Sequence, residues 1–205
     1  MGRYVEPNRV SQFQEDGTEG QTLYVWNNSI SEWAEFRNDG VSDAIPTIDY
    51  SHHKIHSGSH YFYRESHDIA RNATLDHLIV TPDTTKWAHM TIAIENTVSQ
   101  VLIMLYRATT VSANGTLEDS FNRNQNVADD NTTEIYETPT IISVGTELAT
   151  WTLGSGKNLP GGAARDSEEI ILKQGENYLV RVIEPNVSAT TVNITFDWYE
   201  HTSKT

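Results

Sequence analysis

Residues 190–200 read TTVNITFDWYE, a run in which apolar and polar side chains alternate. The apolar members, every second residue from Val192 to Trp198, fall on one face of an extended chain, and polar side chains such as Asp197 fall on the other. This period of two is typical of an antiparallel strand with one buried face. The pattern predicts a half-buried β-strand in which Phe196 and Trp198 point inward.

Similar short runs, apolar or alternating, recur along most of the chain and are separated by turn signals such as TPDTT and GSGKNLPGG. The expected strands cover residues 59–65, 74–80, 87–96, 101–109, 133–142, 147–153, 168–174, 176–184 and 190–200. Apolar residues do not recur at a helical period, so we expect no helix longer than three turns. The pattern predicts an all-β fold, an antiparallel β-sandwich of jelly-roll type with an extended N-terminal arm. A closed barrel is the alternative.

Residues 1–50 differ from the rest because they are polar, with scattered glycines and only short apolar pieces. We interpret them as an N-terminal arm with one or two short strands, and residues 51–205 as the β-sandwich domain. Trp26, Trp33 and Phe36 are the interface candidates, because so polar an arm cannot bury its aromatic side chains alone. The alternative is that the arm folds back on its own domain.

Composition limits the partners of this chain. It carries 28 acidic residues against 14 Lys and Arg, a formal net charge of −14. Such a surface repels phosphate, which argues against binding to nucleic acid or to anionic membranes and favours a basic protein partner. The chain has no cysteine, which excludes disulfides, thiolate zinc sites and thiol nucleophiles. We also find no apolar run of roughly 18 residues that would suggest a membrane span.

Residues 51–67 read SHHKIHSGSHYFYRESH and hold five of the eight histidines. Ligands on one face of a strand need a spacing of two, whereas these histidines are separated by one, three, four and seven residues. His77 and His89 are isolated on other predicted strands. We therefore predict no metal site and interpret the segment as the first main strand, with histidines that serve packing or an interface. Metal binding is the alternative. The histidines concerned are His52, His53, His56, His60 and His67.

Two loops could in principle carry chemistry. Asp129, Asp130 and Glu134 cluster in VADDNTTE, which suggests either a Ca²⁺ site or a solvated acidic loop, although the spacing and the glycine of an EF-hand are missing. The stretch LGSGKNLPGGAARD resembles a phosphate-binding loop only superficially, because Asn158 follows Lys157 where Ser or Thr is required. We interpret it as a hairpin tip that contacts a neighbour. We find no catalytic motif, and we predict neither enzymatic activity nor a cofactor.

Longer stretches carry a resemblance to a known family. The segment GSGKNLPGGAARDSEEIILKQGENYLVRV, followed by NITFDWYEH, resembles the ending of a family of tailed-bacteriophage structural proteins. The similarity extends upstream through KIHSGSHYFYRE, HLIVTPDTTKWAHMTIAIE and LYRATTVSANGTLEDSFNRN, and it covers about residues 50–201.

This resemblance implies a virion component, a head decoration or cement protein made in the host cytoplasm and bound to the outer surface of the phage head. Its implied partners are the major capsid protein and neighbouring copies of itself, with a trimer favoured. The alternative is a receptor- or glycan-binding module of a tail or head fibre. Both classes use jelly-roll sandwiches, so the fold does not separate them. An exposed aromatic side chain with polar neighbours would favour the fibre module.

Overall fold

The structure, a computed structural model, describes residues 50–97, 100–154, 163–165, 169–185 and 189–202, together with four short strands between residues 11 and 35. The chain divides into two compact units, residues 1–48 and 49–205. Within the described residues, no helix combines the length and the hydropathy that a membrane crossing requires.

The first unit contains four short strands, more than the one or two that we predicted. They are β1 (Ser11–Phe13), β2 (Glu19–Gln21), β3 (Tyr24–Asn27) and β4 (Glu32–Glu35). β1 pairs with β2 and β3 pairs with β4, both antiparallel. The described strands of the first unit therefore pair two by two in chain order.

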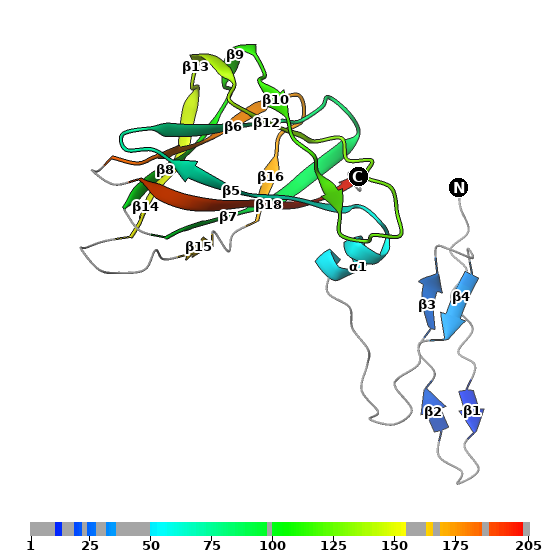
Figure 1. Cartoon of the computed structure of the whole chain (residues 1–205). Helices are drawn as coiled ribbons and strands as arrows, with labels where there is room; N and C mark the ends of the chain where they lie inside the picture. The colour runs from blue at the N-terminus through cyan, green and yellow to red at the C-terminus, as the bar shows by residue number, and fades with distance from the viewer. Residues whose placement is uncertain are drawn as a thin grey trace. The chain divides into compact units, whose positions relative to one another are not determined.

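The second unit is an antiparallel β-sandwich, which confirms the predicted fold class (Figure 1). More than half of residues 51–200 lie in strands. The main strands are β5 (His60–Ile69), β6 (Thr74–Val80), β7 (Lys86–Asn96), β8 (Val101–Arg107), β14 (Thr146–Leu153), β16 (Ile170–Leu172), β17 (Asn177–Ile183) and β18 (Thr190–Thr202).

These eight strands pair as one long hairpin that is folded over itself. β5 pairs with β18, β6 with β17, β7 with β16 and β8 with β14, so the first strand meets the last and pairing proceeds inward. β18 also pairs with β7, and β17 with β8. These contacts produce two sheets, in the orders β5-β18-β7-β16 and β6-β17-β8-β14, and successive strands from β5 to β8 alternate between them.

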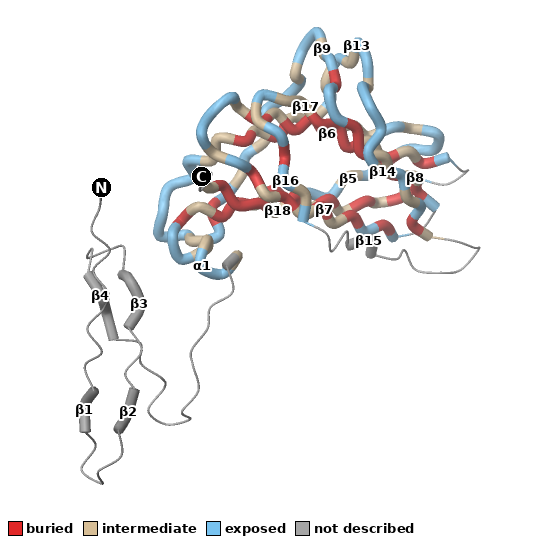
Figure 2. Tube along the Cα trace, turned by 180° about the vertical axis from the view of Figure 1, so that it is seen from behind, coloured by how far each residue is buried: buried red, intermediate tan, exposed pale blue. Residues whose placement is uncertain are grey.

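The core lies between the two sheets, where Figure 2 shows the buried residues of both sheets facing each other. β18 confirms the prediction for its inward face, because Val192, Ile194, Phe196 and Trp198 are all fully buried. Its length lets it pair with β5 on one side and β7 on the other. The period of two in TTVNITFDWYE therefore reports which face of β18 is buried, and the central position of the strand follows from its pairing with β5 and β7.

Between β8 and β14 the chain leaves the eight-strand pattern and forms an excursion, residues 108–145. It contains β9 (Thr110–Ala113), β10 (Thr116–Leu117), β11 (Phe121–Asn122), β12 (Glu134–Glu137) and β13 (Thr140–Ser143). β9 and β13 form a separate two-stranded ribbon, β12 and β10 extend the sheet of β6, and β11 extends the sheet of β5 (Figure 1). The excursion thus covers an edge of each sheet, which protects those edges from unwanted pairing.

Two sequence predictions about local structure are wrong. The single strand expected at residues 133–142 is two strands, because Thr138 adopts a φ of 50° and Pro139, which lacks an N–H, follows. The histidine segment, interpreted as the first main strand, is strand only from His60 onward, in agreement with the strand expected at residues 59–65, and a helix, α1 (Tyr50–His56), precedes it. Gly58, with a φ of 70°, stands just beyond the helix, where glycine commonly ends one.

Candidate functional site

Three side chains with metal-ligating atoms meet at the margin of the sandwich interior. His67 comes from β5 of one sheet, whereas His77 from β6 and Glu137 from β12 belong to the other. Glu137 stands directly opposite His77 in the β12–β6 pair. We call these three residues the histidine–glutamate cluster. It is the one group of three or more potential ligands found in the part of the chain that the structure describes.

The strand period explains why these side chains meet. Each stands two residues from a buried apolar residue of the same strand, Ile69, Ile79 and Ile135 respectively, and therefore on the same inward face. Oε1 of Glu137 lies 3.0 Å from Nε2 of His67 and 3.1 Å from Nε2 of His77. One carboxylate oxygen thus bridges the two imidazoles.

Tyr63 of β5 completes the cluster. Its hydroxyl oxygen lies 3.2 Å from Nε2 of His77, 3.4 Å from Nε2 of His67 and 3.3 Å from Oε1 of Glu137. The hydroxyl also donates a hydrogen bond of 2.9 Å to Glu65. Burial raises the pKa of Tyr63, and the hydrogen bond to Glu65 raises it further, so this group remains a phenol at neutral pH.

Burial determines the charge states within the cluster. His77 is fully buried, and desolvation lowers its pKa, which keeps the ring neutral at pH 7. The hydrogen bond from His77 lowers the pKa of Glu137, which is therefore ionised. Glu118 has a raised pKa, because of desolvation and then the negative charges of Glu137 and Glu65. The neutral imidazole of His77 and the ionised carboxylate of Glu137 therefore meet at one corner of the sandwich.

The other histidines of residues 51–67 lie elsewhere. His52 and His56 stand on one face of α1, with their Nε2 atoms 3.0 Å apart. His60 bonds to Asp197 of β18, which also pairs with Arg123 of the excursion. Burial lowers the pKa of His60. The interpretation that the histidines of this segment lie on the first main strand therefore holds for His60 and His67, but not for His52 and His56 on α1.

Sequence reasoning missed the partners of His67. We treated His77 as isolated, and Glu137 was not singled out. The available signal was the position of His77 within TLDHLIV, where it shares a face with Leu75 and Ile79. A polar side chain on an apolar face is the informative exception to the usual burial pattern. The pairing of β12 with β6 that brings Glu137 there could not be deduced from spacing.

A second polar group lies on β7 and β18. Nε2 of His89 is 2.7 Å from Nε2 of His201, and Nδ1 of His89 bonds to Glu169. The Tyr199 hydroxyl donates to the same carboxylate at 2.8 Å. The His89 and Tyr199 rings stack with centroids 4.7 Å apart.

The three carboxylates considered for Ca²⁺ each accept a hydrogen bond from a different donor. Asp129 accepts a hydrogen bond from the backbone N–H of Asn122, and Asp130 accepts one of 2.6 Å from the Tyr61 hydroxyl. Glu134 accepts one of 2.7 Å from Tyr136. These bonds fix the loop onto the sandwich and β12, and the described residues do not bring the three carboxylates together as a ligand set.

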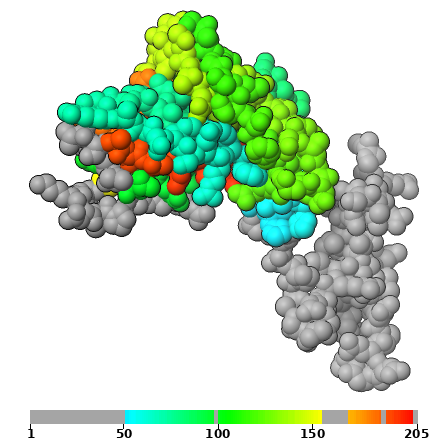
Figure 3. Space-filling view, viewed as in Figure 1, coloured from blue at the N-terminus to red at the C-terminus, as the bar shows by residue number. Residues whose placement is uncertain are grey.

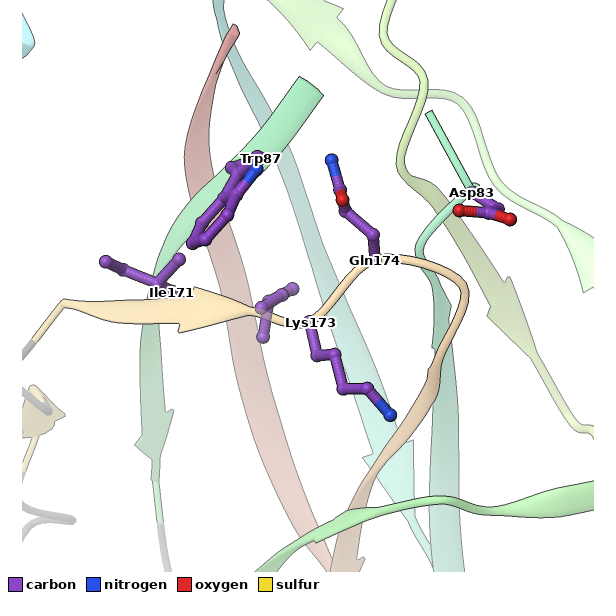
Figure 4. A pocket seen from close by; sticks show the side chains of 6 residues that line it. Asp83, Trp87, Ile171, Lys173 and Gln174 are labelled. Carbon is purple, nitrogen blue, oxygen red and sulfur yellow. The ribbon is translucent and has the colours of Figure 1, made fainter. Parts of the chain in front are cut away.

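A groove of about 420 Å³ is present beside β16 and the start of β7 (Figure 4). Its apolar lining includes Trp87 and Ile171, which are 39% and 50% exposed. Asp83, Lys173 and Gln174 supply polar groups around it. An exposed indole with polar neighbours is the arrangement that the sequence analysis associated with a glycan-binding module.

Several exposed apolar side chains lie in the excursion. Of the large apolar residues that are exposed in the described part of the chain, four belong to it: Leu117, Phe121, Val127 and Ile142. Ile142 on β13 is 70% exposed and Leu117 on β10 is 56% exposed. In Figure 3 the green to yellow atoms of this segment make up one end of the face in view.

Two of the three interface candidates from the sequence pair within the first unit. Trp26 of β3 and Trp33 of β4 are directly opposite each other in the β3–β4 pair. Phe36 lies outside the described residues, as do Lys157 and Asn158 of the glycine-rich loop. Arg165 ends β15 (Ala163–Arg165), which pairs with β7.

The fold and these sites define a protein of the antiparallel β-sandwich class with a histidine–glutamate cluster at the margin of its interior. Comparisons with protein-family models, with curated proteins and with solved structures gave no match.

Proposed function

We propose that this chain is a non-enzymatic virion structural protein that decorates and stabilises the head of a tailed phage. The resemblance of about residues 50–201 to tailed-phage structural proteins supports this assignment. In this role the chain binds the outer surface of the head, in contact with the major capsid protein and with neighbouring copies, as a trimer. It would be made in the host cytoplasm.

The pairing pattern supports the jelly-roll form of the sandwich. A jelly roll is a long antiparallel hairpin wrapped into two sheets, and the pairs β5–β18, β6–β17, β7–β16 and β8–β14 follow that scheme. Capsid proteins commonly use this fold, but unrelated binding modules use it too. Surface features of the chain, and not its fold, therefore separate the possible functions.

The observation that carries the proposal is the apolar surface of the excursion. The eight-strand sandwich closes its core without the β9–β13 ribbon, yet Ile142 on this ribbon and Leu117 beside it expose most of their surface. Single exposed apolar residues are common on monomers, but their concentration on one inserted segment favours a protein contact. The capsid lattice is the partner we assign to it.

A decoration protein acts by mass action. It binds the assembled lattice and not the free subunit, so it shifts the equilibrium toward the assembled shell. Many copies of a modest contact then add up over the particle. The formal charge of −14 adds an electrostatic component if the lattice presents basic groups, and that component should weaken as salt rises.

A particle-binding assay tests this proposal. We expect the double variant Leu117→Asp/Ile142→Asp to bind particles that lack this protein at least about 10-fold more weakly, because each aspartate places a charge in an apolar contact. Both positions are exposed, so the variants should fold normally. Deletion of residues 1–45 should also leave a folded sandwich with weakened binding, if Trp26 and Trp33 anchor the arm.

The double variant and the truncated chain test different parts of the proposal. Full particle binding by the double variant would exclude the excursion as the docking surface. Full binding by the truncated chain would exclude the arm as an anchor, whereas a truncated chain that does not fold would show that the arm belongs to the sandwich. The matched control is Trp87→Ala, which changes an exposed aromatic outside the excursion and should leave particle binding within about 2-fold.

The groove at Trp87 favours a second candidate, a receptor- or glycan-binding module of a tail or head fibre. An indole beside Asp83, Lys173 and Gln174 offers a stacking face together with hydrogen-bonding groups. In this case Trp87→Ala, and not the double variant, would abolish binding to host-surface glycans. The pair of variants therefore separates the two functions.

A further inference from the structure

The histidine–glutamate cluster has a composition that the fold alone does not explain. Each member stands at an inward position next to the core, where an apolar side chain would be expected. A polar group in such a place costs free energy unless it is bonded. The cluster is also rich in acceptors, because the Tyr63 hydroxyl lies within hydrogen-bond distance of two carboxylates, those of Glu65 and Glu137. A bound cation would balance both the acceptors and the charge.

The positions of four atoms match a small tetrahedral site. Nε2 of His67, Nε2 of His77, Oε1 of Glu137 and the Tyr63 hydroxyl oxygen form its corners. Five of the six separations between these atoms fall between 3.0 and 3.4 Å. A tetrahedral ion with bonds of 2.0–2.1 Å requires separations of about 3.3 Å. The ligand atoms of His67, His77 and Glu137 all lie within 4.8 Å of one another, so modest side-chain movement completes the site.

The ligand types select the class of ion. Two imidazole nitrogens and one carboxylate oxygen suit Zn²⁺ and other divalent transition ions, whereas Ca²⁺ and Mg²⁺ prefer sites made of oxygen. We propose that His67, His77 and Glu137 bind a divalent transition-metal ion of the Zn²⁺ type, with the Tyr63 hydroxyl oxygen at the fourth position. This site is independent of whether the chain decorates a capsid.

Such an ion would join the two sheets. His67 belongs to the sheet of β5, and His77 and Glu137 belong to the sheet of β6, so coordination links them in a chain that has no cysteine for a disulfide. It would also fix β12, and with it the excursion, to the sandwich. Nδ1 of His77 has no hydrogen-bond partner among the described residues. Because such a partner usually strengthens a histidine ligand 10- to 100-fold, we expect moderate affinity.

Calorimetric titration of the metal-stripped full chain with Zn²⁺ tests the site. We expect one saturable site for each chain, and a melting temperature that rises by roughly 5–10 °C when free Zn²⁺ exceeds Kd about 100-fold. Ca²⁺ should produce no rise at the same concentration. Co²⁺ in place of Zn²⁺ should give the visible absorption bands of a tetrahedral site.

Single substitutions identify the ligands. Glu137→Gln and His67→Gln should each weaken Zn²⁺ binding at least about 10-fold. A 10-fold loss of affinity is the smallest that we expect when a direct ligand is removed. The matched control is His56→Gln, which removes one histidine of the exposed pair on α1 and should change binding less than 2-fold. Circular dichroism before titration confirms that each variant is folded. Two ligand variants are included so that the failure of one to fold leaves the other as the test.

Three results would overturn the proposal. One is the absence of saturable binding by the unmodified chain. Another is unchanged binding by folded Glu137→Gln or His67→Gln. The third is loss of binding in His56→Gln, which would assign the zinc to the exposed helical pair. None of these outcomes depends on particle binding, so the metal site and the decoration role fail separately.

Discussion

Replacement of Trp198 by alanine is expected to lower the free energy of unfolding by roughly 3–5 kcal/mol, because it removes a large core side chain and leaves a cavity. Trp198 is fully buried in the middle of β18. Its neighbours across the strand pairs are Tyr61 on β5 and Met90 on β7, and its ring lies 6.0 Å from that of Tyr61. Strands on both sides hold the backbone, so we expect the cavity to collapse only in part.

Thermal and denaturant unfolding measure this change. For a unit of this size the melting temperature should fall by roughly 6–20 °C. Trp87→Ala is the matched control, since it removes the same side chain from a position that is 39% exposed and should cost less than about 1 kcal/mol. Equal losses in the two variants would mean that the inward face of β18 is wrongly assigned.

The sequence predicted the parts of the fold that follow from local pattern. In β18 and β7, the alternation of apolar and polar residues reports which face meets the core, because side chains alternate along any strand. The run TLDHLIV gave the bounds of β6 correctly as residues 74–80. These strands are long enough for the period to be visible above chance composition, so their existence and inward faces were predictable.

Features that depend on a few residues were not predictable in this way. α1 has seven residues, too few for a helical period to show, and its histidines do not form an apolar stripe. The break at Thr138 depends on a single positive φ. Short strands of the excursion, such as β10 and β11, have two residues each and are defined by their partners.

The candidate metal site could not be predicted from the sequence, for a related reason. Its members come from three strands, and their meeting depends on which strands pair and in what register. The sequence shows His67 and His77 ten residues apart on separate predicted strands, without indicating that the sheets bring them together. Glu137 is one of 28 acidic residues, and only its pairing opposite His77 distinguishes it.

A second large effect is expected at Glu200, whose carboxylate is almost fully buried near the end of β18. It accepts hydrogen bonds from the backbone N–H groups of Thr132 at 2.9 Å and Thr133 at 2.8 Å. The Thr132 hydroxyl donates a further bond of 2.7 Å, and the Trp198 indole N–H lies 3.3 Å away. One side chain thus satisfies several donors and holds the loop before β12 against the sandwich.

Glu200→Ala should therefore lower the free energy of unfolding by roughly 3–5 kcal/mol, because the N–H groups of the half-buried Thr132 and the buried Thr133 lose their acceptor, and an unpaired buried group costs about 1–3 kcal/mol. Hydrogen exchange should show the local part of this effect as faster exchange of these two amides. The matched control is Glu147→Ala on β14, where an exposed carboxylate accepts one bond from Thr150. Glu147→Ala should change the free energy of unfolding by no more than about 0.5 kcal/mol. Unchanged protection of the Thr132 and Thr133 amides in Glu200→Ala would show that the carboxylate does not hold this loop, and that the end of the excursion is anchored by its strand pairing alone.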